Sequence, residues 1–378
     1  MKTGQQPKRS AWRIPSLLLV GLFAPPVLAD YEMNLVRGAT DLSYRAFDLH
    51  MIALWVCAAI GVVVFGVMFY SLFAFRKSRG AVAANFHDNI TVEVVWTIIP
   101  FIILIAMALP ATKSLLELED TSEADLTIKV TGYQWRWQYD YLDQGVSFFS
   151  NLAATSRDAI KGDPSSVEHY LLEVDEPLVV PINTKVRFVI TSNDVIHSWW
   201  VPAFGWKQDA VPGFINDAWT SVPQPGIYRG QCTELCGKDH GFMPIVVEAK
   251  TREDYDAWLV TKKAQADAAK AGADREWTAD ELMERGKTVY GTYCAACHQA
   301  NGQGIPPAFP ALAGGVITTG PLEGHMSIVL HGKPGTAMQA FGLQLNDVDL
   351  AAVISYERNS FGNAAGDYVQ PGQIKAAR

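Results

Sequence analysis

One short segment concentrates side chains that bind soft metal ions. It runs from Cys232 to Met243 and also contains Cys236 and His240. A mononuclear blue-copper site draws a Cys, a His and a weak axial Met from one loop and a second His from elsewhere. Cys236, His240 and Met243 match that loop, so the thiol of Cys232 is additional. Two thiolates can bridge two copper ions and spread one electron over both. The segment therefore predicts a dinuclear copper electron carrier.

The spacing of the two cysteines also fits other chemistry. A structural zinc site, a disulfide in an oxidising compartment and a redox-active thiol pair are the alternatives. None of them gives Met243 a role. Thiolate, imidazole and thioether together form a soft donor set, which favours copper.

The copper loop needs a histidine from elsewhere in the chain. His197 follows a segment that alternates like a strand and ends near Thr191, and His169 is its competitor in the same region. A strand end is a rigid platform for a fixed ligand. His197 is therefore the favoured second imidazole.

A second redox motif lies near the C-terminus, where Cys294, Cys297 and His298 form the pattern Cys-x-x-Cys-His. This pattern is typical of covalent haem c, with two thioethers and His298 as the proximal iron ligand. A thioredoxin-like site would instead need a strand-helix-strand unit, and the flanking sequence is helical. Met338 lies in a Gly-containing loop that can approach the haem closely, which makes it the leading sixth ligand. Its rivals are Met326, His325 and His331.

Length and composition define the kind of protein. The chain has 378 residues, enough for two or three domains, and a net charge of -8 with 19 % charged residues. No basic stripe is present, so nucleic-acid binding is disfavoured. Four of the five cysteines stand in two tight pairs, which indicates metal or cofactor binding and not a disulfide framework.

The N-terminal part predicts export and membrane anchoring. Residues 1–29 have the basic start, apolar run and small residues of a cleavable signal peptide, with an uncleaved anchor helix as the alternative. The apolar segment at about 49–75 is long enough to cross a bilayer, which needs about 20 residues. A second apolar segment runs from about 92 to 109. The basic residues at 76–79 place the loop between them in the cytoplasm. The two spans then form a hairpin that returns the chain to the outer face.

Glu93 stands near the cytoplasmic end of the second span. An ionisable group at this depth often marks a proton or ion route. So close to the helix end, its side chain can also simply reach the interface. The residue alone leaves both interpretations open.

The middle of the chain predicts a β domain. Alternating apolar residues at 126–130 and 186–190 indicate half-buried strands separated by turn residues, as in an antiparallel sandwich. Aromatic residues stand at every second position of 133–141, and period two predicts that they share one strand face. We expect Trp137, Tyr139 and Tyr141 to be core, with a docking or electron-transfer patch as the alternative.

These observations divide the chain into five segments. The signal peptide is expected at 1–29, the transmembrane hairpin at 30–110 and the copper domain at 111–260. An Ala-rich linker at 261–277, helical in part and mobile in part, leads to a cytochrome c domain at 278–378.

Taken together, the motifs resemble subunit two of haem-copper cytochrome c oxidases with a cytochrome c domain fused at the C-terminus. The most specific part is Cys232-x-Glu-x-Cys236-Gly-x-x-His240-x-x-Met243, with Asp194-Val-x-His197-Ser and Val201-Pro-x-Phe-Gly205. The resemblance runs from the signal segment to near the C-terminus. It implies a multidomain fold with a transmembrane α-helical hairpin, an all-β cupredoxin-like Greek-key sandwich and an all-α cytochrome c domain.

The resemblance also implies roles for the copper-loop residues. The two cysteines would bridge the coppers, His197 and His240 would bind one copper each, and Met243 would be a weak ligand. Glu234 would give its backbone carbonyl to a copper, and its carboxylate would face a magnesium ion at the border with subunit one.

Two further positions take roles from the resemblance. Trp135 matches the tryptophan through which electrons enter the copper domain, although Arg136 stands where a Tyr is common. Glu93 matches the acid at the mouth of one proton path.

The implied function is electron transfer in a terminal, proton-translocating respiratory oxidase of the bacterial inner membrane, with globular domains on the periplasmic side. Electrons would pass from haem c to the dinuclear copper centre and on to catalytic subunit one, which reduces oxygen. Cytochrome c or a quinol-cytochrome c reductase would be the donor, and further membrane subunits are expected. The alternatives are a membrane-tethered haem and copper carrier for another reductase, and a copper-delivery protein.

Overall fold

The computed structural model describes residues 34–378 apart from 86 and 161. The predicted signal peptide at 1–29 lies outside these residues. The chain divides into two units, Met1–Val36 and Arg37–Arg378, and all elements described below belong to the second.

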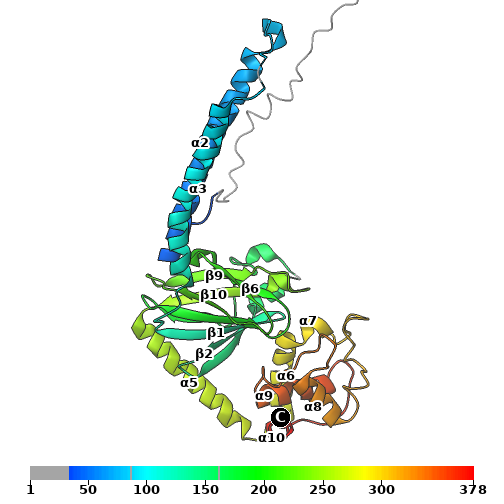
Figure 1. Ribbon diagram of the computed structural model, residues 1–378. Helices are drawn as coiled ribbons and strands as arrows, with labels where there is room; N and C mark the ends of the chain where they lie inside the picture. Colours follow the sequence, from blue (N-terminus) through cyan, green and yellow to red (C-terminus); the bar gives the residue numbers. More distant parts are fainter. Residues whose placement is uncertain (1–33, 86, 161) are drawn as a thin grey trace, which may run out of the picture. The chain divides into compact units, whose positions relative to one another are not determined.

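Two long helices, α2 (Asp41–Ala74) and α3 (Ile90–Glu119), lie side by side in Figure 1. Thr40 and Asn89 cap their N-termini with side-chain oxygens, which accept backbone N–H groups that lack a helical partner. Both helices are long and apolar enough to cross a membrane, and the 3-10 turn η1 (Lys77–Arg79) lies between them. The predicted pair of spans is confirmed.

The second helix is longer than the sequence indicated. It continues through Pro110 to Glu119, beyond the predicted apolar segment at about 92–109 and the predicted domain boundary at 110. Leu and Glu, which dominate the last turns, are strong helix formers. Glu117 also forms an ion pair with Arg45 of α2, and its carbonyl accepts a hydrogen bond from Trp219 of the β domain at 3.1 Å. These contacts hold the last turns in helical form.

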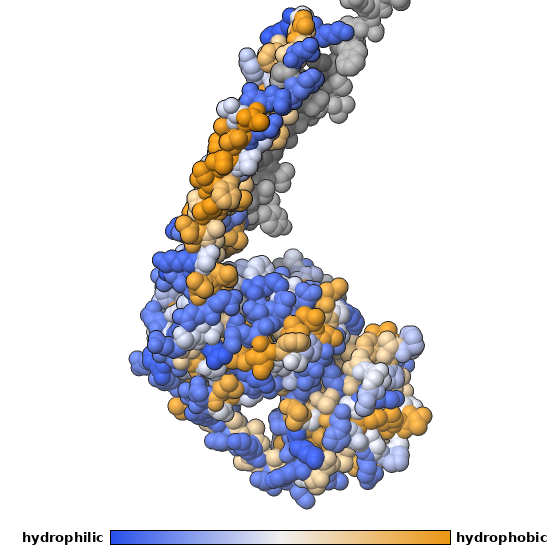
Figure 2. Space-filling model, in the orientation of Figure 1, coloured by the Kyte–Doolittle hydropathy of each residue, from blue (hydrophilic) through white to orange (hydrophobic). Residues whose placement is uncertain are grey.

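The surface of the helical pair is apolar. Figure 2 shows hydrophobic side chains along its visible face, and most exposed residues of both helices are large hydrophobics. Hydrocarbon is a suitable solvent for such a surface, because its side chains are apolar and most backbone groups between the helix ends are bonded within the helix.

Two five-stranded sheets form the β domain. Their strand orders are β3-β2-β1-β5-β8 and β4-β10-β9-β6-β7. The first sheet contains β1 (Leu126–Tyr133), β2 (Arg136–Tyr141), β3 (Val146–Ser150), β5 (Val186–Ser192) and β8 (Asn216–Thr220). The second contains β4 (Leu178–Pro181), β6 (His197–Trp200), β7 (Lys207–Ala210), β9 (Gly226–Cys232) and β10 (Pro244–Lys250). Short helices α4 (Ala154–Ala159), η2 (Pro164–Ser166), η3 (Pro202–Phe204) and η4 (His240–Phe242) connect them.

We predicted an antiparallel sandwich, but two of its strand pairs are parallel. Strand β1 pairs with β5 in parallel, and β10 pairs with β4 in parallel, while the other strand pairs are antiparallel. Parallel neighbours need a long crossover. Each of these pairs has one, since at least two other strands separate its members along the chain. Alternation within a strand does not reveal the direction of its neighbour.

The core follows the predicted alternation. Every second residue from Leu126 to Val130 and from Val186 to Ile190 is buried. Trp137, Tyr139 and Tyr141 are also buried, which confirms their assignment to the core.

The aromatic run does not form one strand, however. Strand β1 ends at Tyr133 and β2 begins at Arg136, so Gln134 and Trp135 form a two-residue turn between antiparallel strands. The period-two pattern continues on both sides of this turn and hides it. Trp135 therefore lies at a hairpin tip and not on the strand face.

Six helices complete the chain, namely α5 (Arg252–Ala273), α6 (Ala279–Tyr293), α7 (Ala295–His298), α8 (Leu322–His331), α9 (Asp347–Arg358) and α10 (Pro371–Ala377). Helix α5 runs without a break through the predicted boundary at 260, because its Ala and Lys residues favour helix. A separate core of buried apolar residues holds the C-terminal helices together. Gly286 of α6 lets α9 approach closely, since a Cβ there would lie 2.1 Å from the carbonyl oxygen of Ala352.

Candidate metal centre

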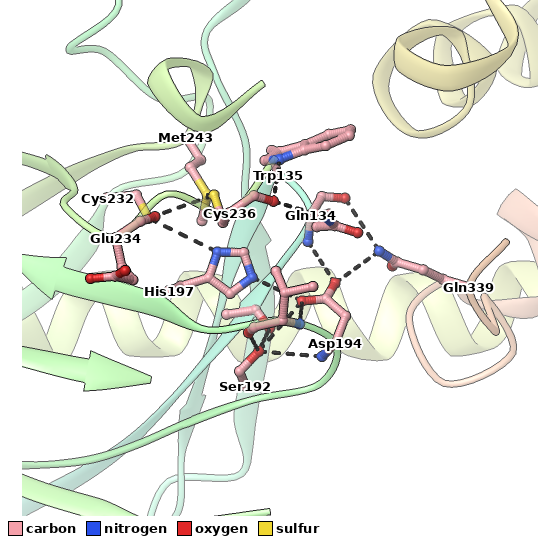
Figure 3. Close-up of polar contacts among 12 residues, drawn as sticks. Gln134, Trp135, Ser192, Asp194, His197, Cys232, Glu234, Cys236, Met243 and Gln339 are labelled. Carbon is pink, nitrogen blue, oxygen red and sulfur yellow. Dashed lines mark hydrogen bonds and ion pairs between the residues drawn. The ribbon is translucent and has the colours of Figure 1, made fainter. Parts of the chain in front are cut away.

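Sulfur and imidazole groups from three segments meet beside the second sheet (Figure 3). His197 begins β6, Cys232 ends β9, and Cys236 lies in the loop that leads to β10. The Cys232 and Cys236 Sγ atoms are 3.8 Å apart, and His197 Nδ1 lies 3.9 Å from Cys232 Sγ. On the other side, Cys236 Sγ lies 3.5 Å from His240 Nδ1 and 3.5 Å from Met243 Sδ. All five predicted side-chain ligands are thus neighbours.

The spacing of the two sulfurs suits a shared metal. A disulfide requires about 2.05 Å between them, so the 3.8 Å separation excludes one in this structure. Thiolates bind metals such as zinc at about 2.3 Å, and two such bonds to one ion can span up to about 4.6 Å. His197, Cys232, Cys236 and Met243 are each at most 4 % exposed, so water is largely excluded from the cluster.

The two cysteine thiols shift each other's pKa in opposite directions. The hydrogen bond from Cys236, followed by that from His197, lowers the pKa of Cys232, although burial acts in the opposite direction. The same bond to Cys232, reinforced by burial, raises the pKa of Cys236. Coordination of a thiol removes its proton outright.

Asp194 orients the buried histidine. Its Oδ1 atom lies 2.8 Å from His197 Nε2, which leaves Nδ1 facing the sulfurs. A carboxylate behind a histidine is the usual way to fix the tautomer and ring orientation of a metal ligand. Asp194 was not assigned a role from the sequence. Its position three residues before His197, within the quoted motif, was the available signal.

The hairpin tip also contacts the cluster. The Gln134 amide and the Trp135 indole N–H both donate to the Cys236 carbonyl, at 2.8 and 3.2 Å. The Trp137 indole donates to the Met243 carbonyl at 3.3 Å. Trp137 is thus a core residue that also supports a candidate ligand, which the sequence did not reveal. Trp135 lies directly against the metal loop.

Glu234 contributes its backbone to the cluster. Its carbonyl oxygen lies 3.4 Å from Cys232 Sγ. Figure 3 shows its carboxylate pointing away from the sulfur atoms. The two groups of this residue therefore face different surroundings.

A glycine makes room for the buried histidine. A Cβ at Gly132 would lie 2.8 Å from His197 Cδ2, closer than real contacts allow. We expect Gly132→Ala to destabilise the domain by about 1–3 kcal/mol through overpacking and to shift the visible absorption of the copper-loaded protein. Gly226→Ala is the matched control, because its Cβ would meet the Tyr228 hydroxyl at an ordinary 3.5 Å. An unchanged spectrum in Gly132→Ala would contradict the placement of His197.

The haem motif forms a short helix in the C-terminal domain. Helix α7 spans Ala295–His298, and both cysteines of the motif are free thiols. His298 Nδ1 lies 2.8 Å from the Pro310 carbonyl oxygen. A carbonyl only accepts, so Nδ1 carries the proton and the Nε2 lone pair remains for a metal. Burial raises the pKa of both Cys294 and Cys297.

Met338 is the leading candidate for the sixth haem ligand. It packs against the same apolar core as Cys294 and is partly buried. Among its rivals, His325 is buried and bound to Glu357 at 2.9 Å, and Met326 is part of the core. His331 is exposed at the end of α8.

The remaining predicted positions lie apart from the cluster. Among the described residues, the buried His and Cys group includes His197 and not His169. Glu93 lies in the first turn of α3, next to the loop between the two spans.

Comparison with known proteins identifies the family. The periplasmic domain of cytochrome c oxidase subunit II matches residues 126–250, and the transmembrane domain of that subunit matches residues 29–114. Subunit III of cbb3-type cytochrome c oxidase matches residues 281–356.

Individual proteins are also similar to this chain. A probable cytochrome c oxidase subunit 2 of Rickettsia bellii is 41 % identical over 236 residues, which cover 62 % of this chain and 86 % of the relative. Cytochrome c oxidase subunit 2 of Cereibacter sphaeroides is 41 % identical over 236 residues, covering 59 % of this chain and 77 % of the relative. The crystal structure of the periplasmic domain of cytochrome oxidase subunit II (CoxB) of Bradyrhizobium japonicum is 41 % identical, with a TM-score of 0.35, and covers 38 % of this chain and 98 % of that domain.

The fold and the ligand cluster define a membrane-anchored copper domain joined to a cytochrome domain. The chain belongs to the cytochrome c oxidase subunit 2 family and carries a cytochrome c domain at its C-terminus. It is an electron-transfer subunit of an oxidase, with a copper centre, haem c and globular domains on the periplasmic side of the membrane. The family therefore disfavours the two alternative functions, a copper-delivery protein and a membrane-tethered electron carrier for another reductase.

Proposed function

We propose that the cluster holds two copper ions bridged by Cys232 and Cys236. His197 and His240 each bind one copper, Met243 is a weak ligand, and the Glu234 carbonyl completes the set. The observation that carries this proposal is the convergence of these donors within 3.9 Å of one or the other sulfur. A pair of copper ions bound here would supply a one-electron redox centre, and the fixed ligand side chains would hold the ions in place.

The protein's contribution is to keep those ligands fixed. Burial of the sulfurs excludes water, and Asp194 holds the His197 ring in one orientation. Gln134 and Trp135 fix the Cys236 carbonyl. Preorganised ligands need little rearrangement when the charge of the site changes, which favours rapid electron exchange.

The proposed haem is attached through Cys294 and Cys297, with His298 and Met338 as axial ligands. The bond from His298 Nδ1 to the Pro310 carbonyl supports this role, since it fixes the ring with Nε2 free.

We propose that electrons pass from cytochrome c or a quinol-cytochrome c reductase to the haem domain, then to the copper domain, and finally to catalytic subunit one. Trp135 is the residue through which they enter the copper domain, and its contact with the Cys236 carbonyl supports that role. Glu93 lies at the mouth of a proton path, supported by its place in the first turn of α3. The Glu234 carboxylate helps bind magnesium at the subunit border, since it points away from the sulfurs.

A pre-steady-state experiment on the detergent-purified oxidase tests this order of carriers. A ruthenium photoreductant injects one electron into haem c, and absorbance follows the haem and copper bands. We expect haem oxidation and copper reduction to proceed with the same rate constant and in equal amounts. Copper reduction without prior haem reduction would contradict the order, and purification without a large multi-span subunit would contradict the proposed partner.

A further inference from the structure

A hydrogen-bonded contact joins the C-terminal domain to the carboxylate that orients His197. Asp194 Oδ1 lies 2.8 Å from His197 Nε2, and its Oδ2 accepts a bond from the Gln339 side-chain amide at 2.9 Å (Figure 3). Gln339 directly follows Met338 in the sequence. Gln339, next to the proposed haem ligand Met338, therefore contacts Asp194, the residue that orients the proposed copper ligand His197.

The Gln339 amide is held at both ends. Its nitrogen also lies 3.5 Å from the Gln134 carbonyl oxygen, at the hairpin tip that carries Trp135. Its oxygen accepts a bond from Gln344 at 3.3 Å, and Gln344 in turn accepts a bond from Arg136. The amide is thus fixed by groups from both domains.

Arg136 makes the contact specific. It is 3 % exposed, and among the described residues no carboxylate forms an ion pair with it. Its guanidinium instead faces four aromatic rings at 4.6–5.8 Å, two from each domain: Tyr133, Phe149, Tyr293 and Phe341. A buried cation without such compensation is costly. The two surfaces therefore complement each other in detail, as expected of a specific docking site.

We propose that Gln339 is a positioning residue that seats the haem domain on the copper domain and steadies His197 through Asp194. This inference rests on the proposed function, because it concerns transfer between the two centres. With both cofactors bound, the exchange would move one electron from a haem held by Cys294, Cys297 and His298 to a copper centre held by Cys232 and Cys236. No proton moves and no covalent bond changes. The Gln339 contact sets how often the two domains are aligned for this exchange.

The test uses the same photoreduction of the purified oxidase with Gln339→Leu, which keeps the volume and removes both polar groups. A hydrogen bond to a charged group is worth about 1.5–3 kcal/mol, so the docking equilibrium should weaken about 10- to 150-fold. We expect slower transfer from haem to copper and an altered electron paramagnetic resonance spectrum of the copper centre. The spectrum is a readout that loss of docking alone, without the link to His197, would not change.

Two further variants make the result interpretable. Gln339→Glu places a second carboxylate against Asp194 and should slow transfer at least as much. Gln303→Leu, an exposed glutamine of the same domain, should behave as wild type. Wild-type rates and copper spectra in both Gln339 variants would overturn the inference. Absence of haem-to-copper transfer in the wild type would instead overturn the proposed function.

Discussion

Changing Cys236 to serine is expected to abolish the copper centre and leave the haem content unchanged. The Cys236 sulfur lies within 3.8 Å of Cys232 Sγ, His240 Nδ1 and Met243 Sδ, so it is central to the cluster. A serine hydroxyl is a hard, protonated donor that copper does not favour over a thiolate. Even loss of a group that only supports a ligand typically weakens metal binding 10- to 100-fold, so loss of the bridge should weaken it by more than about 100-fold.

Copper and haem are measured together in the purified oxidase. Cys57→Ser is the matched control, because Cys57 is an exposed residue of α2 outside the cluster. It should retain full copper and full activity. Copper at wild-type level in Cys236→Ser would show that the loop is not the copper site.

Changing Met338 to histidine is expected to lower the reduction potential of the haem. A thioether ligand raises the potential relative to a second imidazole, and axial ligands as a group span about 0.8 V. The substitution should therefore lower the potential by on the order of 100 mV and change the haem spectrum. Met338 lies in a loop and packs only partly on the core, so the loop can accommodate an imidazole.

The control for this prediction is Met326→Leu. Met326 is buried in the C-terminal core, and a volume-conserving change there should cost less than about 1.5 kcal/mol and leave the potential unaltered. A spectroelectrochemical titration of both variants distinguishes the candidates. An unchanged potential in Met338→His together with a shifted one in Met326→Leu would assign the ligand to Met326.

The identity of the metal and haem ligands could be predicted because most of these residues lie close together in the sequence, in short motifs. Cys232, Cys236, His240 and Met243 occur in one loop, and their donor types alone indicate copper. The spacing of Cys294, Cys297 and His298 was equally informative. His197 required more, since its place depends on where β5 ends and β6 begins, yet strand alternation was sufficient to locate it.

The contacts between distant segments could not be predicted in the same way. Asp194 and Gln339 are 145 residues apart, and Arg136 and Gln344 are 208 apart, so only the folded chain brings them together. The turn at Gln134 and Trp135 was hidden for a different reason. Aromatic residues continue with period two on both sides of it, and the pattern holds no sign of the reversal.

Arg136, between Trp135 and Trp137, is the clearest example of a residue whose role depends on contacts between distant segments. In the sequence it was only a departure from a family pattern, next to the expected position for electron transfer. In the structure its guanidinium lies among rings of both domains. The fused haem domain thus explains the residue, since a buried cation here depends on aromatic surfaces that this domain supplies.

Metal analysis of the purified oxidase subunit tests the central claim most directly. After separation of the subunit from its partners under conditions that retain copper, copper and haem iron are quantified on one sample. Bridging by Cys232 and Cys236 predicts two coppers for each haem iron, with one unpaired electron shared by both coppers in the oxidised form. One copper for each haem, or zinc in its place, would contradict the account.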